Sequence, residues 1–112
     1  MKKISTSIDL DIHFRVLHLL EEDPNLTQRE LAKKLGISLG GVNFWLKALI
    51  DIGHIKIDNF NKNPKKTKYL YLLTPKGITQ KAQLTSGFLK RKMAEYLLLR
   101  EEIDSLQSKL KG

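Results

Sequence analysis

The chain has 112 residues, with 20 Lys and Arg against 12 Asp and Glu, and a formal net charge of +8 at pH 7. This length suits a single domain. The chain contains no cysteine, which excludes disulfide frameworks, thiolate zinc sites, iron–sulfur ligation and cysteine redox sensing. No apolar run reaches the roughly 18 to 20 residues of a membrane span, and charged residues interrupt the N-terminal stretch, so no signal peptide is expected. We therefore expect a cytoplasmic protein that does not enter a membrane.

The positive charge is concentrated in the middle of the chain. Residues 1–53 carry as many acidic as basic residues, whereas residues 54–92 carry ten basic residues and a single acidic residue, Asp58. Such a confined basic region predicts a polyanionic partner at one face of the molecule, most often nucleic acid.

Three short helices are predicted in the first half of the chain. Apolar residues recur at helical spacing over residues 9–22, and Asp23-Pro24-Asn25 favours a turn after them. Thr27-Gln28-Arg29-Glu30 has the pattern of a capping box at the start of a second helix, which Gly36 can close in a left-handed conformation. Ser38 is a suitable N-cap for a third helix over about residues 38–52. Two helices joined by a short glycine-containing turn form a helix-turn-helix, whose second helix can enter the major groove of DNA.

Beyond Gly53 the apolar pattern changes from helical to alternating spacing. Residues 54–58 and 69–73 are predicted strands of a hairpin, and residues 59–68 between them form a polar tip that is rich in lysine. Thr74-Pro75 is a typical helix start. The helix that follows continues to the C-terminus, and Ser86-Gly87 either kinks it or divides it in two.

These elements predict a mainly α fold with a small β-hairpin. Residues 1–74 form a winged helix-turn-helix DNA-binding domain, and residues 75–112 form a long C-terminal helix that acts as a dimerisation arm. An apolar seam at heptad spacing runs along the arm, as is typical of a helix that pairs with a second helix. Parallel, antiparallel and intertwined pairings all remain open. The seam consists of Tyr96, Leu99, Ile103, Leu106 and Leu110.

Candidate base-reading residues lie on the expected outward face of the third helix. Asn43 can pair with adenine N6 and N7, and Lys47 can reach a phosphate or a guanine. Apolar side chains on the same face can contact thymine methyl groups. Gly40 and Gly41 in the first turn have two interpretations, because they either expose backbone amides to a phosphate or let the second helix pack closely. The candidate set is Ser38, Leu39, Gly41, Asn43, Phe44 and Lys47.

Candidate phosphate contacts come from two other segments. At the start of the second helix, Gln28 and Arg29 are placed to hold the DNA backbone. The hairpin tip carries lysines but no arginine, which favours phosphate contact over base reading. Lys90-Arg91-Lys92 on the arm either extends the phosphate contact or keeps the arm soluble. The lysines of the tip are Lys62, Lys65, Lys66 and Lys68.

The sequence offers no candidate catalytic, metal or cofactor site. His13 and His18 are five residues apart, about 140° around a helix, so they cannot share a metal ion. Neither an HExxH motif nor a glycine-rich phosphate loop is present. Trp45 has aliphatic neighbours on its helix and is expected in the core. We therefore expect a protein that is not an enzyme and has no cofactor.

Several segments share their residues with a known family. They are Gln28-Arg29-Glu30-Leu31-Ala32, Leu35-Gly36-Ile37-Ser38-Leu39-Gly40, Val42-Asn43, Leu73-Thr74-Pro75-Lys76-Gly77, Phe88-Leu89-Lys90-Arg91-Lys92-Met93 and Glu95-Tyr96. On these segments the chain resembles the MarR-type winged helix-turn-helix regulators, and most closely the bacterial group called EPS-associated MarR-family transcriptional regulators. The resemblance covers roughly residues 9–107. It implies a DNA-binding transcriptional regulator linked to exopolysaccharide genes. MarR-type proteins usually build their dimer from helices at both chain ends and often bind a small molecule there, whereas this chain has one C-terminal arm, and no small-molecule effector is identified.

We therefore predict a regulator that binds double-stranded DNA with sequence specificity. A two-fold dimer places two recognition helices about one DNA turn apart, near 34 Å, and prefers an inverted repeat. The alternative is a winged-helix module for protein–protein interaction without sequence-specific DNA binding, which predicts weak, salt-insensitive contact with DNA. A structure-selective RNA binder needs exposed aromatic platforms and ranks third.

Overall fold

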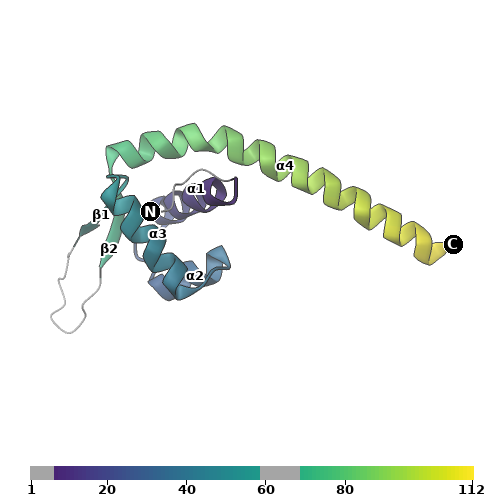
Figure 1. Cartoon of the computed structure of the whole chain (residues 1–112), viewed down its shortest axis with the longest axis horizontal. Coiled ribbons are helices and arrows are strands. Elements are labelled where there is room, and N and C mark those ends of the chain that lie inside the picture. Colours follow the sequence, from purple (N-terminus) through teal and green to yellow (C-terminus); the bar gives the residue numbers. More distant parts are fainter. Residues whose placement is uncertain (1–6, 59–68) are drawn as a thin grey trace.

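In the computed structural model, the described parts of the chain are residues 7–58 and 69–112. Three short helices and a hairpin pack together, and a long final helix crosses them and extends beyond them (Figure 1). This arrangement confirms the predicted mainly α fold with a small β-hairpin. The elements are α1 (Ser7–Glu22), α2 (Gln28–Leu35), α3 (Leu39–Asp51), β1 (Ile55–Asp58), β2 (Leu70–Leu73) and α4 (Pro75–Lys111).

Local capping signals set the ends of α2. The Thr27 hydroxyl accepts a hydrogen bond from the Glu30 amide at 3.1 Å, and the Glu30 carboxylate accepts one from the Thr27 amide at 3.0 Å. These two bonds form the predicted capping box. At the other end, Gly36 has a φ of 68°, a left-handed conformation that glycine adopts without steric penalty. The turn between α2 and α3 therefore takes only residues 36–38.

The starts of α3 and α4 are capped in the same way. Ser38 Oγ accepts from the Gly41 amide at 3.0 Å, and Thr74 Oγ1 accepts from the Gly77 amide at 3.0 Å. Each hydroxyl satisfies one of the amides that have no partner within the first turn of a helix. Pro75 occupies the first turn of α4, as the sequence predicts.

The hairpin is a two-stranded antiparallel sheet in which Ile55 pairs with Leu73 and Asp58 with Leu70. Each strand begins one residue later than predicted, β1 at Ile55 rather than at residue 54 and β2 at Leu70 rather than at residue 69. On the β1 side the reason is that His54 belongs to the turn after α3, where its amide donates to the Leu49 carbonyl at 2.9 Å. Residues 59–68, the predicted polar tip, lie outside the described residues.

The final helix is a single continuous element from residue 75 to residue 111, so Gly87 does not divide it. Its first turn lies directly on the backbone at the start of the hairpin. A Cβ on Gly77 would lie 2.1 Å from the His54 carbonyl oxygen, so only glycine fits there. This close approach explains the glycine of the Leu73-Thr74-Pro75-Lys76-Gly77 segment.

The core lies between α1, α2, α3 and the hairpin. Trp45 is 5% exposed, which confirms its predicted packing role. Among residues 7–58 and 69–112, no helix combines the length and the apolar character that crossing a membrane requires. The buried cluster consists of Val16, Leu17, Leu20, Leu26, Leu31, Val42, Trp45, Leu46, Leu49, Ile55 and Tyr71.

Candidate nucleic-acid interface

Helix α3 presents an apolar face to the core and a mixed face to solvent. Val42, Leu46 and Leu49 are buried, whereas Leu39 and Phe44 are each 44% exposed. The side chains of Ser38, Asn43 and Lys47 are also on the exposed side, and Gly41 is half-buried. The structure therefore brings the six predicted base-reading residues together on one end and side of the helix, with Ser38 already serving as its cap.

The two glycines in the first turn of α3 differ in their surroundings. A Cβ on Gly40 would meet only Ser38 Oγ, at 3.9 Å. A Cβ on Gly41 would meet the same oxygen at 3.3 Å and Ile37 Cδ1 at 3.5 Å. Close packing of α2 therefore does not explain Gly40, and the space beside it is open. That space lies on the solvent side of the candidate interface.

Gln28 and Arg29 behave differently, although both were predicted to contact phosphate. Gln28 Nε2 donates to the Tyr71 hydroxyl at 3.1 Å, across 43 positions in the chain. Gln28 is half-buried, and its side chain links the start of α2 to strand β2, whereas Arg29 is exposed. Tyr71 was missed by sequence reasoning because its alternating pattern predicts only a strand residue. The predicted phosphate contacts Lys62, Lys65, Lys66 and Lys68 all lie outside the described residues.

A pair of buried histidines lies behind α3. His13 Nε2 is 3.0 Å from His54 Nδ1, and the two rings stack with centroids 5.1 Å apart. Burial lowers the pKa of His13 to about 4, with a further contribution from His54. Burial also lowers the pKa of His54, as does the nearby Lys76 ammonium. Both rings are therefore neutral at pH 7, and one donates its N–H to the lone pair of the other.

Sequence reasoning compared His13 only with His18, its neighbour in the chain. The true partner is 41 positions away, and no local pattern indicates it. Within the part of the chain that the structure describes, no group of three or more His, Cys, Asp or Glu side chains is arranged to hold a metal ion.

The basic segment of α4 has a role that neither sequence interpretation foresaw. Arg91 Nε lies 2.7 Å from Asp11 Oδ1, and Lys92 Nζ lies 2.9 Å from Asp11 Oδ2. These two side chains hold α4 against α1, whereas Lys90 is exposed. Burial raises the pKa of the Asp11 carboxyl, but the hydrogen bonds from Lys92 and Arg91 outweigh it and leave the pKa below its usual value.

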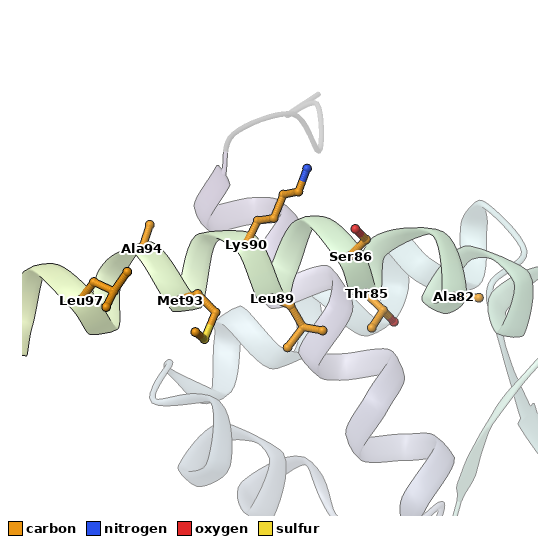
Figure 2. Close-up of a pocket in the computed structure, with 8 residues that line it drawn as sticks. All are labelled: Ala82, Thr85, Ser86, Leu89, Lys90, Met93, Ala94 and Leu97. Carbon is orange, nitrogen blue, oxygen red and sulfur yellow. The ribbon is translucent and has the colours of Figure 1, made fainter.

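The exposed side of α4 forms a shallow apolar groove along one helix. Figure 2 shows Leu89 and Met93 along one edge of this groove and Lys90 along the other edge. Farther along the helix, the five predicted seam residues are all between 46% and 89% exposed. Such a long exposed apolar surface is unusual for an isolated helix and is typical of an interface. The groove is lined by Ala82, Thr85, Ser86, Leu89, Lys90, Met93, Ala94 and Leu97.

Comparison with known proteins agrees with this geometry. Residues 9–56 match a family model described as winged helix-turn-helix DNA-binding. The chain is 30% identical over 84 residues to the HTH-type transcriptional regulator PetP of Rhodobacter capsulatus, a match that covers 75% of this chain and 49% of PetP. The chain thus spans about half the length of that curated relative.

Two solved structures share the fold at low identity. The DNA complex of MepR from Staphylococcus aureus has a TM-score of 0.62 and 21% identity, and the match covers 91% of this chain and 76% of MepR. A MarR family protein of Mycobacterium tuberculosis in complex with salicylic acid has a TM-score of 0.62 and 20% identity, and that match covers 88% of this chain and 75% of the other.

The fold and the exposed face of α3 define a winged helix-turn-helix protein. Residues 9–56 carry the winged helix-turn-helix module. Together with the hairpin and the long C-terminal helix, this module has the MarR-like fold.

Proposed function

We propose that the protein is a MarR-type transcriptional regulator that binds double-stranded DNA with sequence specificity through α3. The observation that carries this proposal is that α3 has one buried face and one exposed face. Leu39, Asn43, Phe44 and Lys47 lie on the exposed face. A helix of this kind, held by its buried face next to a short turn, has the geometry that enters a major groove. The winged helix-turn-helix match over residues 9–56 supports the same function.

Each exposed side chain of α3 has a distinct role in the proposed contact. Asn43 makes two hydrogen bonds with adenine N6 and N7, and Leu39 and Phe44 contact thymine methyl groups. Lys47 binds a phosphate or a guanine. Arg29 and the hairpin-tip lysines Lys62, Lys65, Lys66 and Lys68 bind phosphates, which sets the register of the protein on the duplex.

The Asn43→Ala variant tests base reading by α3. We expect it to weaken binding to the preferred duplex by about 1 to 3 kcal/mol and to leave binding to random DNA nearly unchanged. Asn25→Ala is the matched control, because Asn25 is an exposed asparagine in the turn between α1 and α2. Equal losses on both duplexes for Asn43→Ala would rule out base reading by this residue.

We also propose that α4 joins two copies of the chain in a homodimer. The support is the exposed apolar seam at heptad spacing, which would otherwise remain in water. Leu106 and Leu98 are both 61% exposed, but only Leu106 belongs to the seam. Leu106→Glu should therefore dissociate the dimer in sedimentation equilibrium, whereas Leu98→Glu should not. Identical behaviour of the two variants would remove the seam as the interface.

The regulated genes are proposed to include those for exopolysaccharide production. The support for this finer assignment is the sequence resemblance to the EPS-associated group. Chromatin immunoprecipitation with the native protein tests it, because binding upstream of such genes is expected. Sites found only elsewhere in the genome would contradict it.

A further inference from the structure

One carboxylate on the side of α1 that faces α4, that of Asp11, binds two cations. Asp11 accepts from Arg91 at 2.7 Å through one oxygen and from Lys92 at 2.9 Å through the other. Its side chain is 15% exposed, so water screens these contacts less than contacts on an open surface. Charge-assisted hydrogen bonds of this length are among the strongest polar contacts in proteins.

An aromatic contact lies beside the ion pairs. The Phe14 and Phe88 rings stack with centroids 4.4 Å apart, one ring from α1 and one from α4. The cations of Arg15 and Lys92 lie 5.4 Å and 5.5 Å from the centre of the Phe88 ring. Together with Asp11 and Arg91, these residues form a contact that we call the α1–α4 clasp.

Among residues 7–58 and 69–112, the clasp contains the last residues of α4 that are not exposed. Lys81 pairs with Glu21 nearer the start of α4, and Gly77 packs on the hairpin backbone. From residue 93 to the C-terminus, every residue of α4 is exposed. The direction of this projecting arm (Figure 1) is therefore set where α4 leaves the clasp.

We propose that Asp11 is a positioning residue that fixes the direction of the projecting arm and so sets the half-site spacing that the dimer accepts. The inference rests on the proposed function, because two copies joined by their arms separate their α3 helices by a distance that the arm direction determines. At 1.5 Å per residue, twenty residues of arm extend about 30 Å. A tilt of about 10° at the clasp moves the far end by roughly 5 Å, more than the 3.4 Å rise of one base pair.

The first experiment compares spacing preference between variants. Duplexes that carry two inverted half-sites separated by different numbers of base pairs are selected with wild-type protein and with Asp11→Asn. In the wild type, one spacing should bind more tightly than the next best. We expect the ratio of these two affinities to be about three- to tenfold smaller in Asp11→Asn. Overall affinity for a single half-site should stay nearly constant, because Asp11 does not lie on α3.

Glu22→Gln is the matched control for charge. Glu22 is on the same helix, and its carboxylate lies 3.1 Å from Nε2 of His18, one turn away, rather than against α4. Glu22→Gln changes the net charge by the same amount as Asp11→Asn and should keep the wild-type spacing preference. Phe88→Leu is a second test that leaves the charge unchanged, and it should relax the spacing in the same direction as Asp11→Asn. An unaltered preference in both clasp variants would overturn the proposal.

A second measurement tests the clasp without DNA. The natural chain has no cysteine, so Lys34→Cys in α2 and Ser105→Cys in the arm provide two specific spin-label positions. Electron–electron double resonance is recorded with excess unlabelled protein, so that distances within one chain dominate. We expect a narrow distance distribution in the wild-type background and a broader one with Asp11→Asn. An equally narrow distance distribution in Asp11→Asn would overturn the proposal. This result does not depend on DNA binding. Failure of the wild type to bind DNA would instead count only against the proposed function.

Discussion

His13 and His54 share a hydrogen bond inside the domain, with 3.0 Å between Nε2 of one ring and Nδ1 of the other. The bond joins α1 to the turn between α3 and β1. The His54 carbonyl also accepts from the Thr74 amide at 3.0 Å, immediately before α4 begins. The centroids of the His13 and Trp45 rings are 6.2 Å apart, and the Lys76 ammonium lowers the pKa of His54. One residue pair therefore connects α1, α3, the hairpin and the start of α4.

This pair predicts that stability depends on pH. Because the folded-state pKa of His13 is about 4, below the ordinary value of 6.5, the unfolded chain binds more protons between these values. The contribution of neutral His13 to the free energy of unfolding is fully present above pH 6.5 and is lost as the pH falls toward 4. His13 alone accounts for about 3 kcal/mol over this range. Urea unfolding between pH 7 and pH 4.5 measures the effect.

His13→Gln provides the control for this pH dependence. It should flatten the slope of unfolding free energy against pH between 4.5 and 6.5, whatever its effect on stability at pH 7. The Lys76 ammonium also lowers the pKa of His54, so this second ring adds to the same dependence in the wild type and in His13→Gln. Constant stability of the wild type from pH 7 to pH 5 would contradict the neutral buried pair.

The hydrogen bond between Gln28 and Tyr71 predicts coupled effects of two substitutions. Gln28→Met and Tyr71→Phe each remove this bond while largely keeping size, so each should lower the unfolding free energy by about 0.5 to 1.5 kcal/mol. The double variant should lose little more than either single variant. Chemical unfolding of the four proteins measures the coupling. Additive losses would show that the two side chains do not stabilise the fold through a common bond.

Gly40 predicts opposite changes in stability and in DNA affinity. A Cβ there meets nothing closer than Ser38 Oγ at 3.9 Å, and alanine is the better helix former, so Gly40→Ala should stabilise the fold by up to about 1 kcal/mol. If DNA approaches the start of α3 closely, the added methyl group should weaken specific binding. Thermal unfolding and fluorescence anisotropy test the two effects separately. Unchanged affinity in a stabilised variant would mean that DNA does not approach Gly40.

Two other glycines form a matched pair for the packing of α4. Gly77→Ala should destabilise the fold by about 3 kcal/mol, because its Cβ would lie 2.1 Å from the backbone oxygen of His54. Gly87→Ala should cost much less, because its Cβ would lie 3.2 Å from Arg91 Nη1, a side-chain atom that has to shift only slightly. Thermal unfolding of both variants compares them. A Gly77→Ala protein as stable as Gly87→Ala would contradict the close contact of α4 with the hairpin.

The parts of the fold that the sequence predicts well depend on neighbouring residues. Thr27 and Glu30 are three positions apart, so their capping box is visible in the sequence, as are the caps Ser38 and Thr74. Apolar spacing separates the buried and exposed faces of α3 because helical geometry alone relates them.

The parts that the sequence does not predict depend on residues far apart in the chain. Asp11 and Arg91 are 80 positions apart. Gln28 and Tyr71 are separated by 43 positions. These contacts arise only when α1, α2, α4 and the hairpin pack together. Gln28 and Lys92 are examples, because each is a candidate phosphate contact in the sequence but bonds to another part of the domain in the structure.

Selection from a randomised duplex library tests the proposed function most directly. The full chain is used at about 150 mM salt, where nonspecific phosphate affinity is suppressed. We expect enrichment of an inverted repeat whose half-sites lie about one DNA turn apart, near 34 Å. If the folded protein enriches no sequence, sequence-specific DNA binding through α3 is wrong, and a winged helix that docks other proteins becomes the better explanation.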